Sequence, residues 1–248
     1  IEAIRLNNKY VAVLCEGRVH LQLIEPRAGT QDQDTKIFAA TSDGSSGRIT
    51  CLELTNNLLV YGWSGSNGGG LKFFSLEDWV PLDGIDYRHG TAPTQIVPSP
   101  SGTRFMLIDT SGRGWLYNPA DSSALEVPNF SSDSGSAKGG VSSSGNPIKR
   151  VLWDPVGDQS GRLSGNRGSS GGVGSSHGSL AQTFVTVEGG HFWTYVYSQL
   201  HFEGPAIFRI GRLDVNPETG DMEQQPLPTE VPHGASAAVV RNGRVTCQ

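Results

Sequence analysis

Three carboxylates stand where they could take part in acid–base chemistry, because each lies in or at the end of a predicted strand. Asp109 and Glu188 end strands just before or at a hairpin, and Glu53 lies within a strand. Paired carboxylates that converge in a channel can support hydrolysis or bind a metal ion. Turn capping by Asp109 and Glu188, with Glu53 in solvent, explains the same residues without chemistry. We favour turn capping and expect no catalytic, cofactor-binding or metal-binding residues.

The histidines form no metal-binding or catalytic pattern in the sequence. No two of them follow the H-x-x-x-H or H-E-x-x-H spacing of helical zinc sites. They are His20, His89, His177, His191, His201 and His233. His89 lies in the stretch "YRHG" at the end of a predicted sheet, within reach of a neighbouring strand. We therefore predict a structural hydrogen bond for His89.

Two glycine-rich stretches imitate functional motifs. Residues 168–172 and 174–178 match G-x-S-x-G, but a nucleophile elbow needs a strand before its serine and a helix after it. Neither match has that context, and both lie in one Gly/Ser tract, so composition explains them. Residues 62–70, "GWSGSNGGG", lack the G-x-G-x-x-G spacing and the following helix of a phosphate site. We interpret residues 62–70 as a long hairpin link.

Charge and hydrophobicity exclude two classes of partner. The net charge of the 248 residues is −5, whereas a nucleic-acid-binding surface needs a basic stripe. No apolar run reaches the roughly 18 residues of a membrane-spanning helix. We therefore expect no binding to nucleic acid and no direct insertion into a membrane.

The cysteines and the two ends of the sequence suggest an intracellular excerpt. Cys15, Cys51 and Cys247 are far apart and odd in number, so we expect neither a disulfide framework nor a zinc site, but a reducing compartment. No signal peptide opens the sequence. Because Ile1 and Gln248 both fall within patterned segments, we expect the chain to be part of a longer protein.

Short apolar runs predict strands that are buried on both faces. They are residues 10–14, 58–61, 105–108 and 184–187, rich in β-branched and aromatic residues. Each run is followed by a turn and a further strand, predicted at 19–24, 71 onwards, 115–118 and 192–197. A strand precedes three of these pairs (49–54, 94–97 and 148–153), and a weaker one follows three of them (81–87, 125–130 and 206–213). The unit is therefore a set of four strands.

This unit repeats along the chain. Second strands begin near Tyr10, Leu58, Arg104, Thr183 and Arg244. The first two intervals are a little above the roughly 40–45 residues of a WD-type blade, and removal of the Gly/Ser tracts restores the third. Stacked four-stranded sheets explain burial on both faces. The alternative is a β-sandwich, in which most strands would have one polar face.

We predict an all-β, WD40-like β-propeller, with four full or partial blades plus a terminal fragment of a seven-bladed ring. Residues 1–248 form one partial propeller. Residues 131–146 and 157–179 are Gly/Ser-rich flexible loop insertions within it, because they lack the apolar content that offsets ordering entropy. The five tryptophans are spread along the units, which favours packing between blades over one aromatic binding site.

Several blocks of sequence resemble one family. They are "NKYVAVLCEGRVHLQLIE", "LLVYG…LKFFSLEDWVPLDGIDYRHG", "PSPSGTRFMLID…GWLYNPADSSALEVPNFS", "IKRVLWDP" and "NGRVTCQ". They resemble the second propeller of the WD-repeat protein nineteen family, the large WD-repeat subunit of intraflagellar transport complex A. The sequence departs from the family in its long Gly-rich links and in the absence of WD dipeptides at strand ends, and the insertions suggest a green-algal lineage.

The resemblance implies a non-enzymatic scaffold of ciliary transport, with no cofactor. It would support retrograde transport and the entry of membrane cargo, at the cytoplasmic side of the cilium or flagellum and at the basal body. Its partners would be other complex A subunits and a tubby-type cargo adaptor. Two alternatives remain open, namely a peptide-reading module outside cilia that uses basic residues such as Arg88 and Arg113, and a propeller hydrolase.

Overall fold

The computed structural model describes most of the first half of the chain and shorter stretches of the second. The described residues are 1–25, 34–40, 47–130, 151–155, 181–188, 191–199, 201, 203–209, 211–215, 222–226, 229–230, 238–241 and 244–247. The predicted loop insertions at 131–146 and 157–179, with both G-x-S-x-G matches, lie outside these residues. The chain divides into two compact units, one made of Ile1–Pro98 and Gly102–Ala124, the other of Ser99–Ser101 and Leu125–Gln248.

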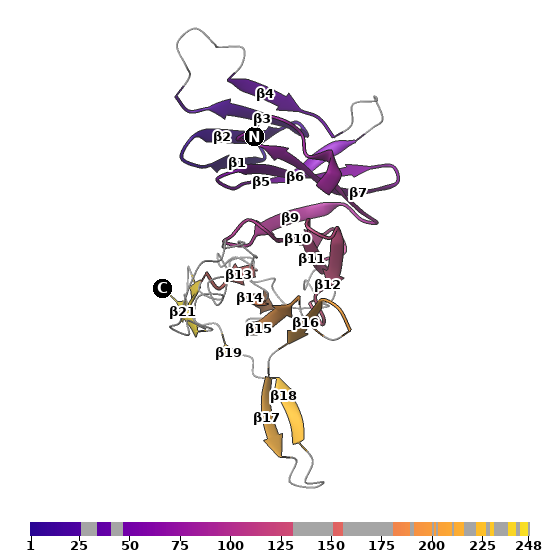
Figure 1. Cartoon of the computed structure of the whole chain (residues 1–248), viewed down its shortest axis with the longest axis vertical. Helices are drawn as coiled ribbons and strands as arrows, with labels where there is room; N and C mark the ends of the chain where they lie inside the picture. Colours follow the sequence, from indigo (N-terminus) through magenta and orange to yellow (C-terminus); the bar gives the residue numbers. More distant parts are fainter. Residues whose placement is uncertain are drawn as a thin grey trace, which may run out of the picture. The chain divides into compact units, whose positions relative to one another are not determined.

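Four antiparallel sheets of four strands follow one another along the chain, each in simple chain order (Figure 1). The first contains β1 (Ala3–Leu6), β2 (Tyr10–Cys15), β3 (Arg18–Leu23) and β4 (Thr35–Phe38). The second contains β5 (Arg48–Leu54), β6 (Leu58–Gly65), β7 (Gly68–Ser75) and β8 (Tyr87–His89). The third contains β9 (Pro93–Pro98), β10 (Phe105–Asp109), β11 (Gly114–Asn118) and β12 (Ser123–Glu126). The fourth contains β13 (Val151–Trp153), β14 (Ala181–Glu188), β15 (His191–Ser198) and β16 (Ala206–Arg209).

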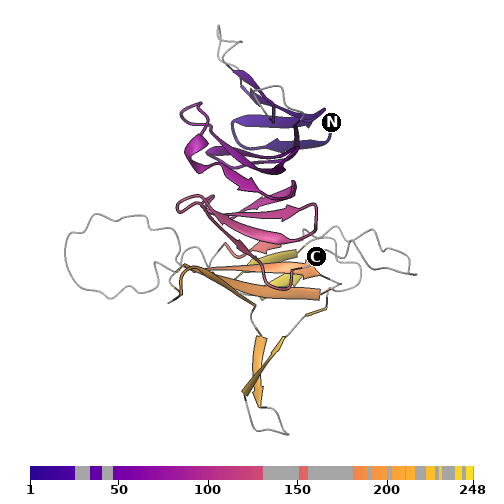
Figure 2. The same ribbon diagram turned by 90° about the vertical axis from the view of Figure 1, so that its right-hand side faces the viewer.

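In the first unit the sheets are stacked in chain order (Figure 2). Strand β5 lies next to both β1 and β9. The middle sheet is therefore covered on both faces, which rules out a two-layer sandwich with a solvent-exposed face on each sheet. This is the arrangement of a β-propeller, and the predicted fold class is confirmed. We call the four sheets blades 1 to 4.

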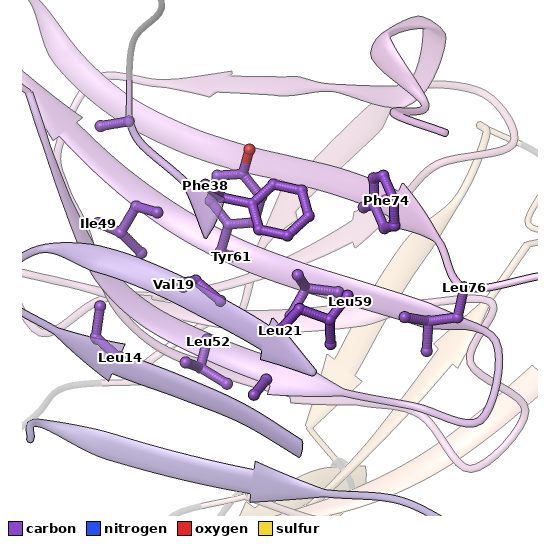
Figure 3. Packing of buried hydrophobic residues seen from close by; sticks show 12 residues of the cluster. Leu14, Val19, Leu21, Phe38, Ile49, Leu52, Leu59, Tyr61, Phe74 and Leu76 are labelled. Atoms are coloured by element: carbon purple, nitrogen blue, oxygen red, sulfur yellow. The ribbon is translucent and has the colours of Figure 1, made fainter. Parts of the chain in front are cut away.

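Two apolar layers hold blades 1 to 3 together. The layer between blades 1 and 2 contains Leu14, Val19, Leu21, Phe38, Ile49, Leu52, Leu59, Tyr61 and Phe74, all buried (Figure 3). The layer between blades 2 and 3 contains Val60, Leu71, Phe73, Ile96, Phe105, Leu107 and Tyr117. Neighbouring residues of β6 thus point into different layers, since Leu59 belongs to the first and Val60 to the second. This explains why the strand is apolar at successive positions.

The structure corrects the interpretation of residues 62–70 as a long link. Strand β6 continues to Gly65 and β7 begins at Gly68, so only Ser66 and Asn67 form the turn. The glycines allow close packing of backbone, because a Cβ on Gly70 would lie 2.0 Å from the carbonyl oxygen of Tyr87. Gly68, the residue directly after this turn, also has a φ of +111°, a backbone conformation that favours glycine.

The fourth strands of the blades are less regular than predicted. The strand expected at 81–87 is displaced to β8, after the short 3-10 helix η1 (Asp83–Ile85), and Pro81 forms only an isolated bridge with Phe74. Proline lacks the N–H that a continuous ladder needs. The strand expected at 125–130 begins and ends earlier, as β12, and residues 127–130 form a turn closed by the N–H of Phe130 and the carbonyl of Val127.

The predicted last strand at 206–213 is split in blade 4. Its first part is β16, whereas β17 (Gly211–Val215) pairs with β18 (Met222–Pro226) in a separate hairpin. The chain then returns as β19 (Thr229–Glu230), which pairs with His191 and Phe192 of β15. Because β16 pairs with Tyr195–Ser198 of the same strand, β16 and β19 complete one edge of β15 from either side of the hairpin.

Two further strands follow blade 4. Strands β20 (Ala238–Arg241) and β21 (Arg244–Cys247) form a hairpin, and β20 lies next to β13, the first strand of blade 4. This repeats the relation of β1 to β5, so the hairpin has the place of the first two strands of another blade. The terminal fragment predicted from the repeat at Arg244 is thereby confirmed.

Candidate functional site

The densest polar cluster of the first unit surrounds Asp109, the last residue of β10. One carboxylate oxygen, Oδ1, accepts hydrogen bonds from the N–H of Ser111 (2.8 Å), the hydroxyl of Ser111 (2.5 Å) and the N–H of Arg113 (3.1 Å). These bonds close the hairpin that leads into β11. The predicted capping of this turn by Asp109 is therefore confirmed.

The other oxygen of Asp109 binds groups from outside its own turn. Oδ2 accepts hydrogen bonds from the hydroxyl of Thr91 (2.8 Å) and the indole N–H of Trp115 (3.2 Å), and it lies 3.2 Å from Nε2 of His89. Because His89 ends β8, this contact joins blade 2 to blade 3. The hydrogen bond predicted between His89 and a neighbouring strand is thus confirmed.

His89 is itself positioned by aromatic side chains. Its Nδ1 lies 3.0 Å from the hydroxyl of Tyr87, and its ring meets that of Trp115 edge to face with 4.9 Å between centroids. Tyr87 stacks on Tyr117 at 4.6 Å, and the hydroxyl of Tyr117 donates to the carbonyl of Ile85. We call Tyr87, His89, Thr91, Asp109 and Trp115 the Asp109 cluster.

The Asp109 cluster is shielded from solvent, and both oxygens of its carboxylate are surrounded by hydrogen-bond donors. The exposed fraction of the side chain is 2% for Asp109 and 8% for His89. Burial alone would raise the pKa of Asp109, but the hydrogen bonds from Ser111, Thr91, His89 and Arg113 outweigh it and hold the pKa well below its usual range. A carboxylate with so low a pKa and no access for substrate is a poor general base. The arrangement fixes one blade to the next.

The other two predicted carboxylates do not join Asp109. Glu53 accepts a hydrogen bond from Nε of Arg5 at 2.7 Å, and its side chain is 20% exposed. The expectation that Glu53 simply faces solvent is therefore wrong, because β1 supplies a cationic partner. Glu188 ends β14 in the second unit, and its side chain lies outside the described residues. The structure thus gives Glu53 and Asp109 separate partners.

Cysteine chemistry and metal binding find no support in the part of the chain that the structure describes. Burial raises the pKa of Cys51 to about 11, so its thiol stays protonated at neutral pH and is a weak nucleophile. No group of three or more His, Cys, Asp or Glu side chains among the described residues could hold a metal ion. Nor does any helix there have the length and apolarity needed to cross a membrane.

The tryptophans are distributed over separate contacts. Trp63 and Trp79 pack against the apolar layer between blades 1 and 2, and Trp153 meets Phe184 in blade 4. The guanidinium of Arg209 lies 3.2 Å from the ring centroid of Trp193. The predicted distribution over the blades is confirmed.

Sequence reasoning missed two members of the Asp109 cluster, Thr91 and Trp115. Trp115 was assigned to packing alone, although its indole N–H also binds Asp109. A usable signal was present, because an aspartate that ends a second strand is followed six residues later by a tryptophan in the third. Thr91 follows His89 by two residues, which places both at the junction between blades.

The sequence matches a known family of propellers. The family model described as the WDR19 second beta-propeller matches residues 1–137, more than half of the chain. WD repeat-containing protein 19 of Homo sapiens is 28% identical over 250 residues, and that of Mus musculus is 26% identical. Each alignment covers 100% of this chain and 14% of the relative, so the chain spans only a small part of the length of these relatives. Among solved structures, Hsv2 of Kluyveromyces lactis has a TM-score of 0.47 and 11% identity, covering 92% of this chain and 61% of that one. On the match over residues 1–137, the chain belongs to the WDR19 second beta-propeller family.

Proposed function

We propose that the chain is a non-enzymatic scaffold propeller of intraflagellar transport complex A. The family match over residues 1–137 carries the proposal. The Asp109 cluster supports it, because this buried polar cluster stabilises the contact between two blades. In this role the protein supports retrograde transport and the entry of membrane cargo into the cilium or flagellum, and it acts at the cytoplasmic side and at the basal body.

Its proposed partners are the other subunits of complex A and a tubby-type cargo adaptor. A propeller suits this role, since its rigid sheets present loops at fixed positions for binding several proteins. A hydrolase receives no support, because Glu53 is bound by Arg5 and Asp109 is saturated by donors of its own and the neighbouring blade.

The test is affinity capture from ciliated cells with a tagged full-length protein that carries this propeller. We expect complex A subunits in the captured fraction and fluorescence of the tagged protein at the basal body and along the cilium. Leu107→Asp, which places a charge in the layer between blades 2 and 3, should abolish the part of the capture that depends on this propeller.

Asn56→Asp is the matched control, because it adds the same side chain at an exposed position in the turn between β5 and β6. Its capture should equal that of the unchanged protein. Recovery of no complex A subunit with the unchanged full-length protein would refute the proposal.

A further inference from the structure

The connections between strands lie at two opposite ends of the blades. In a four-stranded meander the first-to-second and third-to-fourth connections share one end, while the second-to-third turn and the link to the next blade share the other. In the first unit the latter end contains residues 15–18, 47–48, 64–68, 89–92 and 110–113, which we call the turn rim. The opposite end contains residues 7–9, 24–25, 55–57, 76–80, 102–104 and 118–122, which we call the loop rim.

Contacts between successive blades make the turn rim one connected surface. The carbonyl of Gly17 in blade 1 accepts a hydrogen bond from the N–H of Ile49 in blade 2 at 2.9 Å. Between blades 2 and 3, the carbonyl of Ala92 accepts one from the N–H of Thr110, also at 2.9 Å, beside the contact of His89 with Asp109. The positions of the side chains along this rim are thus tied to one another through the backbone.

Exposed charges are separated between the two rims. The turn rim and its flank carry four exposed arginines, Arg18, Arg48, Arg88 and Arg113, with two exposed carboxylates, Glu2 and Glu16. The described residues of the loop rim carry four exposed carboxylates, Glu25, Glu77, Asp78 and Asp121, with one exposed lysine, Lys9. Among the described residues of the first unit, these exposed arginines thus gather at the turn rim, and these exposed carboxylates at the loop rim.

Part of this positive charge is available to a ligand. Arg48 pairs with Glu2 at 2.9 Å, although its side chain remains 63% exposed. Arg18 and Arg88 form no ion pair with any residue that the structure describes. Arg88 precedes His89, and the backbone N–H of Arg113 donates to Asp109, so these two arginines flank the same closed cluster in neighbouring blades. The Asp109 cluster therefore holds the backbone of both cationic positions in place.

We propose that the turn rim binds an acidic segment of a partner protein. Guanidinium groups bind carboxylates through two parallel hydrogen bonds, which suits exposed arginines spaced along a rigid edge. A nucleic acid fits less well, because duplex binding commonly uses about six to ten phosphate contacts and the rest of the chain is acidic. The inference rests on the proposed scaffold function and names the chemistry by which one partner is recognised.

The experiment measures binding of a fluorescein-labelled octapeptide of alternating glutamate and serine to the whole chain by fluorescence anisotropy at low salt. We expect saturable binding that is lost in high salt, and no binding of the same peptide with glutamine in place of glutamate. The double variant Arg18→Glu, Arg88→Glu should weaken binding by about tenfold or more. Lys9→Glu on the loop rim is the matched control and should change it less than about twofold.

Several outcomes would overturn the proposal. They are equal weakening by Lys9→Glu, equal binding of the glutamine peptide, no binding at low salt, and tighter binding of an octathymidine oligonucleotide than of the acidic peptide. Circular dichroism must show the same melting temperature for the double variant and the unchanged chain, since both arginines are exposed. Failure here is distinct from failure of the scaffold proposal, because capture of complex A subunits by the full-length protein is measured without this peptide.

Discussion

Blade 2 is packed on both sides, and its two interfaces differ in how deeply their charged contacts are buried. Toward blade 1 the charged contacts are ion pairs at the margin, with Arg5 41% and Arg48 63% exposed. Toward blade 3 the main polar contact is the Asp109 cluster, with the carboxylate 2% exposed. Exposed ion pairs contribute roughly 0–1 kcal/mol, whereas loss of one partner in a buried charged cluster costs about 3–5 kcal/mol. One interface thus depends on apolar packing, and the other depends also on a single aspartate.

The largest expected effect should be the same at both interfaces. Leu21 and Leu107 are each 0% exposed, one in each apolar layer. Leu21→Asp and Leu107→Asp should each lower the free energy of unfolding by more than about 4 kcal/mol, because each buries an unpaired charge. Urea denaturation followed by tryptophan fluorescence measures this, and Asn56→Asp in the exposed turn between β5 and β6 is the control. A loss below 1 kcal/mol in either variant would contradict the assignment of its layer.

The second prediction separates the two interfaces. Asp109→Asn keeps the shape of the side chain, but it removes the charge and places an amide NH2 next to groups that are themselves hydrogen-bond donors. It should therefore cost about 3 kcal/mol of folding free energy. The same urea experiment checks this value. The comparison fails if Asp109→Asn costs no more than the equivalent change at Glu53.

The third prediction concerns acid. The folded-state pKa of Asp109 is lower than the ordinary value of about 3.9, so its contribution to stability is complete above that value and is lost as the pH falls toward the folded pKa. The unchanged chain should therefore lose stability more steeply below about pH 4 than Asp109→Asn does. Melting temperatures at a series of pH values test this, and parallel curves for the two chains would exclude a special role for Asp109.

The smallest effect is expected at the interface between blades 1 and 2. Glu53→Gln keeps the side chain's size and removes only its charge beside the half-exposed guanidinium of Arg5. It should cost about 1 kcal/mol or less, and the cost should shrink in high salt. A cost of 3 kcal/mol or more would show that this ion pair is as important as the Asp109 cluster.

The sequence predicted those parts of the fold that depend on local patterns. The second strands were found because apolar runs such as 105–108 face neighbours on both sides, and Asp109 was placed correctly because capping acts within a few residues. The prediction of a long link at 62–70 was wrong, because the glycines allow close packing against the backbone of Tyr87, which is distant in sequence. Thr91 was missed for a similar reason, since its partner Asp109 lies in the next blade. Trp115 lies in the same hairpin as Asp109 and was missed because it was assigned to packing alone.

The split edge of blade 4 indicates where this fold can accept an inserted sequence. Strand β15 keeps its register with β16 at one end and with β19 at the other, although a complete hairpin separates these two strands in sequence. Arg209 ends β16 with its guanidinium over Trp193, beside the place where the edge changes from one strand to the other. An excursion at a sheet edge disturbs no inner strand, and its length has little effect on the entropy of closing the loop. The segment between β16 and β19 is therefore a natural insertion point for a fluorescent reporter or an epitope tag.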